Sequence, residues 1–383
     1  MKRQTGTYEI STVAGEEVRA FLPTALPPSN PPLDLDALDT PLRESSGKLR
    51  ELELAGHMVP SVDWFVYAFV RKEAVLSSQI EGTESTFMDL LESEATGKAT
   101  NDRDLEEVCC YLDAIHFAWA EMDSPSGLPV SMRLLSETHQ RLLSSVRGKD
   151  KQPGEVRRSQ NWLGGTRPGT AAFVPAPPHR LQALLTEFEQ AIHTESDLHP
   201  LIRAGLLHVQ FETLHPYLDG NGRLGRLLIA LLLKHWGLMS RPLLYLSLFL
   251  KTHQREYYER LGAVRTDGDW EGWLAFFLRG VAETAGDAAG TAQVLNSIVI
   301  DCRAKAHAHP NATVLGLRLF ELLPEHPIVG VRLASELLAC SRPAATKALG
   351  SLEAAGILAP YENAERGRTL SFEPYLAPLR DGK

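Results

Sequence analysis

Helical periodicity over most of the chain constrains the fold more than any other feature of the sequence. Apolar residues recur at intervals of three and four within the ranges 42–55, 60–81, 103–121, 130–145, 179–193, 198–213, 222–236, 251–264 and 270–285. This spacing places apolar side chains on one face of each helix, and that face must be buried against a neighbour. Because runs of β-branched residues are few, we predict a mainly α-helical core.

Two segments interrupt this pattern. Residues 22–42 contain six prolines, which exclude a helix or a central strand and predict an extended strap. In Gln160–Pro178, glycines and prolines bracket the short apolar piece Ala171–Val174. Such bracketing predicts a short β-hairpin or flap on the surface.

The last part of the chain has a different organisation. Gly330–Leu338 and Arg342–Ala355 have helical patterns separated by a tight turn, and Pro343 lies in the first turn of the second one. Two short strand patterns then follow, Ile357–Tyr361 and Thr369–Phe372, on either side of a polar tip. Helix, turn, helix and β-wing predict a winged helix-turn-helix domain over residues 308–383.

Composition limits the classes of function. With 383 residues, the chain is long enough for two or three domains. A net charge of -9 excludes a general electrostatic attraction to nucleic acid or to an anionic membrane. There is no apolar run of about 18 residues, and the four cysteines lack metal-binding or C-x-x-C spacing. We therefore expect a cytoplasmic protein without a membrane segment.

The stretch Leu214–Leu228 (LHPYLDGNGRLGRLL) combines charged residues and glycines at the start of an apolar helix. Its glycine spacing satisfies the dinucleotide fingerprint G-x-G-x-x-G, but that motif needs a buried strand before it, and a helical pattern precedes this one. An ordinary capped helix would explain the glycines or the arginines alone. It would not explain their combination with His215 and Asp219.

A phosphate-binding loop explains the whole combination. Gly220 and Gly222 lack side chains, so backbone N–H groups and the positive end of the helix dipole can face an anion. Arg223 and Arg226 share one helix face, and they suit a polyphosphate. Asp219 offers an oxygen ligand of the kind that holds Mg²⁺ beside phosphates, and the histidine can accept a proton at neutral pH.

The sequence His215-Pro216-Tyr217-Leu218-Asp219-Gly220-Asn221-Gly222-Arg223-Leu224-Gly225-Arg226 resembles the Fic-family signature H-P-F-x-[D/E]-G-N-G-R-x-x-R, with Tyr217 in place of Phe. The likeness extends over roughly residues 60–285. It implies a Fic-like helical core that transfers AMP from ATP to a Tyr, Thr or Ser hydroxyl of a protein and releases pyrophosphate. Gly222 argues against the phosphotransferase branch of the family, which has Lys there.

The resemblance also implies roles for individual residues. His215 would deprotonate the target hydroxyl, and Asp219 would hold Mg²⁺ on the α- and β-phosphates. Arg223 would bind the β-phosphate region and Arg226 the γ-phosphate. The residues implied to bind ATP are Gly220, Asn221, Gly222, Arg223, Leu224, Gly225, Arg226 and Tyr258. For Tyr258, the second of two adjacent tyrosines, a structural role is an equal alternative.

Residues 77–82 (SSQIEG) resemble the inhibitory motif [S/T]-x-x-x-E-[G/N] of the same family, with Ser77, Glu81 and Gly82 at its specified positions. Glu81 lies on a partly apolar helix face and at a helix C-terminus, where a carboxylate is disfavoured. Arg226 lies at a helix N-terminus, where a cation is disfavoured. Pairing the two would resolve both conflicts and predicts autoinhibition; a surface glutamate before a helix-ending glycine is the alternative.

These patterns divide the chain into an N-terminal helical segment with the inhibitory helix (1–100), a Fic-like catalytic core (101–290) and the winged-helix domain (308–383). The flap near 171–174 is expected to dock a protein substrate by strand addition, or else to be a plain hairpin. The winged helix suggests an alternative function as a DNA-binding regulator, with Arg342, Lys347, Arg366 and Arg368 as contacts, or a protein interface. The chain itself as a modification target, and a second copy of the chain in a homodimer, are two further expected partners.

Overall fold

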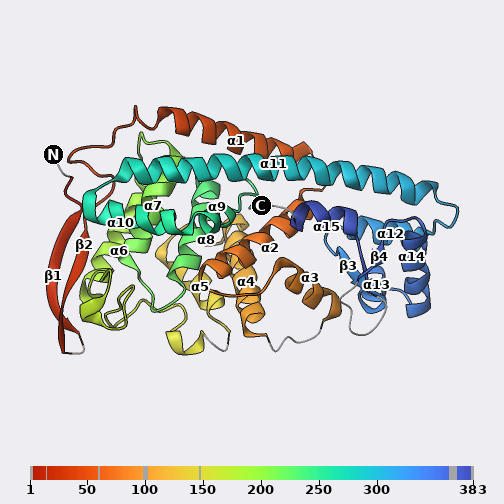
Figure 1. The fold of residues 1–383 in the computed structure, drawn as a ribbon, viewed down its shortest axis with the longest axis horizontal. Helices are drawn as coiled ribbons and strands as arrows, with labels where there is room; N and C mark the ends of the chain where they lie inside the picture. The colour runs from red at the N-terminus through yellow and green to blue at the C-terminus, as the bar shows by residue number, and fades with distance from the viewer. Residues whose placement is uncertain are drawn as a thin grey trace.

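One long helix organises the molecule. The computed structural model describes residues 3–13, 15–58, 61–97, 102–145, 148–361 and 369–380. The molecule is elongated, and α11 (Trp270–Ala308) runs along most of its length, with α1 (Asp39–Met58) beside it (Figure 1). The prediction ended this helix at 285, but it continues through Gly286, where α1 passes close by at Lys48. Tertiary packing there outweighs the low helix propensity of glycine.

The predicted helical core is confirmed. Below α11 lie α2 (Val62–Ile80), α4 (Arg103–Asp123), α5 (Met132–Leu142), α6 (Pro178–His193), α7 (Pro200–Leu214), α8 (Asn221–His235), α9 (Ser247–Thr252) and α10 (Gln254–Asp267). Helix α8 is buried on nearly every side, and even its polar residues Asn221, Arg223 and Arg226 are at most 4% exposed. The glycine-rich motif therefore begins a helix that lies inside the core.

Helix α3 (Phe87–Thr96) was not predicted from periodicity. Thr86 and Asp89 form a capping box at its N-terminus, and Gly97 ends it with a left-handed backbone conformation. The sequence therefore contained signals for the start and the end of this helix, in Thr86, Asp89 and Gly97. The apolar residues between them are too few to show a clear helical period.

A β-hairpin at the N-terminus was not predicted either. Strands β1 (Gly6–Val13) and β2 (Glu16–Pro23) pair antiparallel, with Gly6 opposite Pro23 and Val13 opposite Glu16. They stand at the end of the molecule far from the C-terminal elements (Figure 1). The proline-rich strap therefore begins in β2 and continues from there to α1.

The predicted flap differs from a β-hairpin. Within Gln160–Pro178, a single bridge joins Leu163 to Phe173, and a short 3₁₀ helix, Pro168–Thr170, lies between them. Gly164 and Gly165 have positive φ, so the backbone turns away before a ladder can form. The flap also contacts β2, because the backbone N–H of Phe21 donates to the Val174 carbonyl over 2.9 Å.

The C-terminal elements are α12 (Val314–Leu322), β3 (Ile328–Gly330), α13 (Val331–Leu338), α14 (Arg342–Ala354), β4 (Ala359–Pro360), β5 (Thr369–Ser371) and α15 (Glu373–Arg380). Their strands form an antiparallel sheet in the order β3-β5-β4. The expected wing tip, including Arg366 and Arg368, lies outside the described residues, and the winged helix stays a prediction. Helix α15 returns toward α2, where the Tyr375 hydroxyl donates to the Trp64 carbonyl over 3.4 Å.

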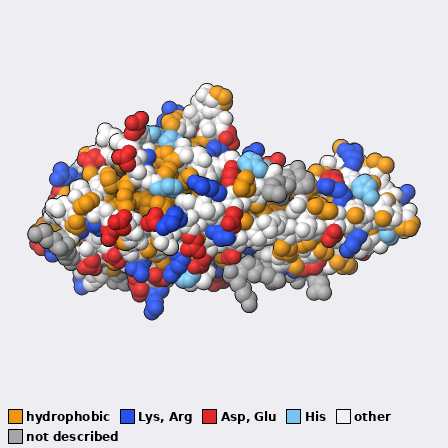
Figure 2. Space-filling model, turned by 90° about the horizontal axis from the view of Figure 1, so that it is seen from above, with side chains coloured by type: hydrophobic (Ala, Val, Ile, Leu, Met, Phe, Trp, Pro, Cys, Tyr) orange, Lys and Arg blue, Asp and Glu red, His pale blue; other side chains and the backbone are white. Residues whose placement is uncertain are grey.

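The face over α1 and α11 carries acidic and basic side chains interspersed with apolar ones (Figure 2). Leu54, Val294 and Ile300 on these helices are each about half exposed or more. None of the helices that the structure describes is long and apolar enough to cross a membrane. The homodimer expected above stays a prediction.

Candidate active site

The loop between α7 and α8 is held in one shape by its own side chains. His215 ends α7 with a left-handed backbone (φ 47°), and Gly220 precedes α8 with φ 74°. The Asn221 side chain accepts a hydrogen bond from the Tyr217 N–H and donates one to the Tyr217 carbonyl, both over 2.9 Å. The Tyr217 ring is fully buried and its hydroxyl lies 2.9 Å from the Ser136 hydroxyl oxygen. Tyr217 therefore serves as the aromatic anchor of the motif.

His139 supports the same loop from α5. Its Nδ1 accepts a hydrogen bond from the Gly154 N–H over 2.9 Å, so Nε2 carries the proton and donates to the Asp219 carbonyl over 2.9 Å. The ring also stacks on Tyr217 at 3.9 Å between centroids. Burial lowers the pKa of His139 to about 4, so the neutral tautomer holds the loop at neutral pH.

Arg157 holds the backbone around His215. It is 1% exposed. Its Nε donates to the His215 carbonyl over 2.9 Å, Nη2 donates to the Ala176 carbonyl over 2.5 Å, and its backbone N–H donates to the Pro216 carbonyl over 2.9 Å. A cation at the C-terminus of α7 is favoured by the helix dipole. Arg157 thus fixes the left-handed turn that aims the His215 ring.

His215 has the protonation state that a general base needs. Burial, and next the positive charge of Arg157, lower the pKa of His215 to about 4. Its Nδ1 is buried and has no hydrogen-bond partner. At neutral pH the imidazole is therefore uncharged and can accept a proton.

Asp219 lies at the mouth of the loop. Its side chain is 48% exposed, and Oδ1 accepts a hydrogen bond from the Gly220 N–H over 2.6 Å. Within the described ranges, no group of three or more His, Cys, Asp or Glu side chains is arranged to hold a metal ion. A single exposed carboxylate does fit Mg²⁺, which is commonly bound by one or two carboxylates together with substrate phosphates.

The two motif arginines have different partners. Nη1 of Arg223 lies 3.1 Å from Glu107 Oε2, and the Tyr111 hydroxyl donates to the Arg223 carbonyl over 3.2 Å. Arg226 turns toward α2 instead. Its Nε donates to Ser77 Oγ over 2.9 Å, and Nη2 donates to the Ser77 carbonyl over 2.9 Å and to Glu81 Oε1 over 2.7 Å.

Glu81 covers the first turn of α8. A Cβ atom on Gly222 would lie 2.3 Å from Glu81 Oε1, so the missing side chain leaves room for this carboxylate. Burial opposes ionisation of Glu81, but Arg226 outweighs it and lowers the pKa of Glu81 below its ordinary value. Gly82 follows with φ 100° and ends the helix. The anion at the N-terminus of α8 in this structure is therefore a side chain of the chain itself.

A cavity of about 910 Å³ opens beside these residues. Its lining includes His215, Gly222, Arg226, Glu81 and Tyr258, so the structure brings these predicted residues together. Asp219, Gly220, Asn221, Arg223, Leu224 and Gly225 belong to the adjoining loop and helix and are not part of this lining. The cavity continues along the flap and the strands β1 and β2, which supply Tyr8, Glu17, Val18 and Arg19.

Sequence reasoning missed several residues of this region. Arg157 and His139 hold the loop, and Glu212 and Arg265 line the cavity. Burial raises the pKa of Glu212 to about 7, and the Arg265 guanidinium lies 4.1 Å from the centre of the Phe173 ring. Their partners come from distant parts of the chain, so no local spacing could identify them.

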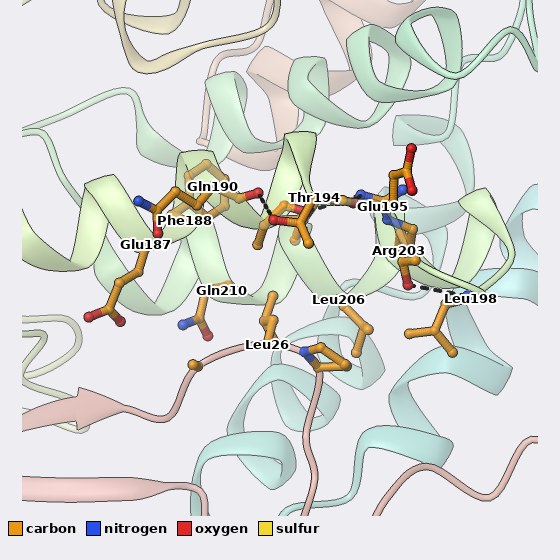
Figure 3. A pocket seen from close by; sticks show the side chains of 15 residues that line it. Leu26, Glu187, Phe188, Gln190, Thr194, Glu195, Leu198, Arg203, Leu206 and Gln210 are labelled. Atoms are coloured by element: carbon orange, nitrogen blue, oxygen red, sulfur yellow. Dashed lines mark hydrogen bonds between the residues drawn. The ribbon is translucent and has the colours of Figure 1, made fainter.

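A separate cavity of about 270 Å³ lies on another side of α7 (Figure 3). The strap residue Leu26 faces Phe188 of α6 and Leu206 of α7 across it, and Glu187 and Glu195 lie toward its ends. None of the predicted site residues lines it. Of the predicted DNA contacts, Arg342 and Lys347 are exposed on α14.

Comparison with known proteins gives consistent matches. A family model described as "Fic/DOC family N-terminal" matches residues 40–120, and one described as "Fic/DOC family" matches residues 129–233. Proteins named protein adenylyltransferase Fic from Drosophila willistoni and Drosophila melanogaster are 32% and 30% identical over 151 residues, which are 39% of this chain and 27% of each relative. The match spans about a quarter of the length of these relatives.

Solved structures share the fold. A Fic family protein from Desulfovibrio desulfuricans aligns with a TM-score of 0.56 at 18% identity, over 88% of this chain and 95% of that chain. Fic-1 from C. elegans aligns with a TM-score of 0.51 at 21% identity, over 68% of this chain and 73% of that chain. At these identities the likeness concerns the fold.

Proposed function

Because this chain belongs to the Fic/DOC family, we propose that it is a protein adenylyltransferase. It transfers AMP from ATP to a side-chain hydroxyl of a protein, and Glu81 holds its activity low. The relatives named protein adenylyltransferase Fic support the reaction class. The residues around α8 support the chemistry and the inhibition.

The observation that carries this proposal is the ion pair between Glu81 and Arg226 at the N-terminus of α8. The Arg226 side chain is 2% exposed, and its Nε and Nη2 donate hydrogen bonds to Ser77 and Glu81. A guanidinium engaged in this way cannot also bind a γ-phosphate in bidentate fashion. The carboxylate of Glu81 thus competes with the nucleotide for the same cation and the same helix terminus.

The reaction follows from the remaining side chains. The neutral ring of His215 takes the proton of the target hydroxyl, whose oxygen attacks the α-phosphorus; the bond to pyrophosphate breaks on the opposite side. Backbone N–H groups of residues 220–222 and the dipole of α8 stabilise the phosphate charge. Mg²⁺, held through Asp219, would neutralise part of that charge. Most of the rate enhancement comes from positioning and charge stabilisation.

The flap near 171–174 supports docking of the protein target, but part of its edge is already used. The Val174 carbonyl accepts its hydrogen bond from β2. An extended target segment therefore meets a flap that is continuous with β1 and β2, and the N-terminal hairpin becomes part of the target-binding region.

The test compares the wild type, Glu81→Gly and Glu81→Gly/His215→Ala with α-labelled ATP, Mg²⁺ and a cell lysate as target source. Loss of the Glu81 contact removes a charged hydrogen bond of about 1.5–3 kcal/mol, so we expect label on protein to rise by roughly tenfold or more. The added His215→Ala change should lower the rate by about 10²–10⁴-fold. Chelation of Mg²⁺ should abolish labelling.

Glu84→Gly is the matched control. Glu84 is exposed three residues after Glu81, and its backbone N–H contacts Asp104 of α4. This variant should transfer AMP to protein at the wild-type rate. Absence of α-label in every variant would contradict the proposal, and γ-label or retention on DNA would favour a phosphotransferase or a DNA-binding regulator.

A further inference from the structure

Strand β1 lies at the outer edge of the N-terminal hairpin. Its partner β2 contacts the flap on the other side, because the Phe21 N–H donates to the Val174 carbonyl over 2.9 Å. Figure 1 shows β1 as the outermost element at this end of the molecule. Among the residues that the structure describes, the side of β1 that faces away from β2 is therefore the free edge of the hairpin.

The hydrogen-bond pattern of the hairpin identifies the backbone groups on this edge. The Thr24 N–H donates to the Thr5 carbonyl over 3.0 Å, and this pair extends the register of the two strands. Hydrogen-bonded and non-hydrogen-bonded pairs alternate along an antiparallel ladder. The even-numbered residues of β1, which include Tyr8, Ile10 and Thr12, therefore point their N–H and C=O groups away from β2.

This edge lacks the features that usually keep edge strands apart. Natural sheets protect such edges with prolines, lysines, bulges, very short strands or a covering element. Strand β1 has 8 residues without proline or lysine, and it pairs with β2 without a bulge from Gly6 to Val13. The Ile10 side chain is 64% exposed. An unprotected edge of this kind is typical of a strand that pairs with another chain.

The edge is held in a fixed position. Arg3, which precedes β1, forms an ion pair with Glu271 of α11 at 2.9 Å. Glu9 lies 2.8 Å from His179 Nε2 and 3.1 Å from Arg180 Nε of α6. Glu9 is also the only charged residue of β1, so the charge of this strand is compensated within its own chain. Pairing along the edge therefore requires little further ordering.

The sequence of β1 is complementary to a second copy of itself in one register. In a two-fold antiparallel pair, the outward-pointing even residues must face each other. An axis at residue 9 would place two Glu9 side chains directly opposite each other, which is unfavourable. With the axis at residue 10, two Ile10 side chains face each other and Tyr8 faces Thr12. Axes nearer either end would leave more of the strand unpaired.

A protein target fits this edge less well than a second copy does. A segment added to β1 would lie three strand spacings from the flap, each of about 4.8 Å. A target hydroxyl must reach His215, which lines the same cavity as the flap. The edge of β1 is therefore suited to a contact beside the site rather than to the strand that carries the target hydroxyl.

We propose that β1 is a homodimer interface, in which its free edge pairs antiparallel with the same edge of a second copy about a two-fold axis at Ile10. The two hairpins then form one sheet in the order β2-β1-β1-β2. Pairing of one short strand gives a small interface, so the dimer dissociates on dilution. This inference goes beyond the proposed function and does not rest on it.

The second copy also extends the wall of the candidate active-site cavity. Tyr8 and Arg19 line that cavity, and the Arg19 guanidinium lies 4.7 Å from the centre of the Tyr8 ring. Residues directly opposite each other on paired strands share a face. Thr12 of the second copy therefore continues this face beside Tyr8.

Sedimentation velocity of the full chain tests the interface. We expect the wild type to change from monomer to dimer over roughly a hundredfold range of concentration around the micromolar level. Ile10→Lys and Ile10→Glu each place like charges opposite each other at the axis, and each should raise the dissociation constant by about fivefold or more. An equimolar mixture of the two variants should restore association, because a lysine then faces a glutamate.

Ile300→Lys is the matched control. Ile300 is 51% exposed and lies toward the C-terminal end of α11, whereas the hairpin contacts the N-terminal end of that helix through Glu271. This variant should associate as the wild type does. Thermal unfolding of dilute samples should show that every variant is folded.

A cysteine at the axis tests the register. The Cα atoms of a hydrogen-bonded antiparallel pair are about 5.5 Å apart, which a disulfide can span. Ile10→Cys should therefore form an intermolecular disulfide on mild oxidation, identified by mass spectrometry as two linked peptides that contain residue 10. Tyr8→Cys should not link to itself, because residue 8 faces Thr12 of the second copy.

The outcomes decide the inference independently of the enzyme assays. A chain that stays monomeric over this range would overturn it, and so would dimerisation that is unchanged in both Ile10→Lys and Ile10→Glu. A disulfide between Tyr8→Cys chains and none between Ile10→Cys chains would also overturn it. Restored association in the mixture and a link at residue 10 would support it. Absence of AMP transfer would contradict the proposed function and leave this result unchanged.

Discussion

At the scale of single residues, Arg157 decides how His215 can act. It donates to carbonyls on both sides of the α7 terminus and is itself buried. Burial lowers the pKa of Arg157 to about 10, so the guanidinium still carries its charge at neutral pH. The same charge lies beside the imidazole. One side chain thus supports the left-handed backbone at 215 and disfavours protonation of the ring.

Replacing Arg157 with Met should raise the pKa of His215 from about 4 toward its ordinary value of about 6.5. The base must be uncharged, so the acid limb of the pH–rate profile should move to higher pH in the Glu81→Gly background. The variant also leaves buried carbonyls without donors, which should lower the free energy of unfolding by about 2–5 kcal/mol. The His215 titration by NMR and urea denaturation measure the two effects.

Arg157→Lys separates charge from geometry. Lysine keeps the positive charge but has a single nitrogen in place of the planar guanidinium, so it cannot reproduce the hydrogen bonds that Nε and Nη2 make to separate carbonyls. This variant should have a lower rate of AMP transfer, whereas the acid limb of its pH–rate profile should change little. Equal acid limbs in the wild type, Arg157→Lys and Arg157→Met would show that Arg157 does not influence the protonation of His215.

At the scale of elements, the last turn of α2 is the surface that contacts Arg226 of α8. Ser77 and Glu81 lie one turn apart on this helix and both contact Arg226. The next residue, Ser78, is equally buried, but its hydroxyl has no hydrogen-bond partner. Of these two neighbouring buried serines, Ser77 therefore contacts the arginine through its hydroxyl and Ser78 does not.

Ser77→Ala removes the acceptor of Arg226 Nε and leaves a buried charged donor unpaired. We expect a loss of about 1–3 kcal/mol in the free energy of unfolding. The basal rate of AMP transfer should rise, because Arg226 is held less firmly against α2. Denaturation and α-label transfer measure both.

Ser78→Ala is the control for that change. It removes a hydroxyl that contributes no hydrogen bond, so stability and basal rate should stay close to those of the wild type. If Ser77→Ala and Ser78→Ala behave alike in the transfer assay, the Ser77 contact is not part of the inhibition.

At the scale of the whole molecule, the C-terminal elements pack against α3 and contact α2. Leu376 of α15 and Ile328 of β3 form a buried cluster with Leu91 and Ala95 of α3, which follows α2 in the chain. At the other end of α2, the Trp64 carbonyl accepts the hydrogen bond from α15. Both ends of α2 are therefore adjacent to contacts with the C-terminal part of the chain.

Leu376→Ala should open a cavity in this cluster and cost about 2–5 kcal/mol. We expect faster hydrogen exchange over Phe87–Thr96 than in the wild type, measured by mass spectrometry. Val314→Ala truncates an aliphatic side chain of the same C-terminal part that is 76% exposed, and it should leave this exchange unchanged. Unchanged exchange in Leu376→Ala would contradict a stabilising role of the C-terminal contacts.

The helical core and the motif could be predicted from the sequence because their signals are local. Apolar spacing determines helix faces, and residues 215–226 contain their own turn, the start of a helix and the residues predicted to bind phosphate. The adjacency of Glu81 and Arg226 was predicted from two helix ends whose charges were each unfavourable alone. The structure places this pair at 2.7 Å.

Tertiary structure alone decided the rest, because the deciding partners are far apart in the chain. Arg157 and His139 bind backbone carbonyls of the motif. Because every residue has such a carbonyl, the amino-acid sequence does not indicate which ones are bound. Strand β2 pairs with the flap through one backbone hydrogen bond, so side-chain patterns predicted neither the hairpin nor its position. The length of α11 likewise depends on the packing of α1 beside it, close to Gly286. Local chemistry is specified by adjacent residues, whereas closure of a cavity depends on contacts between segments that only folding brings together.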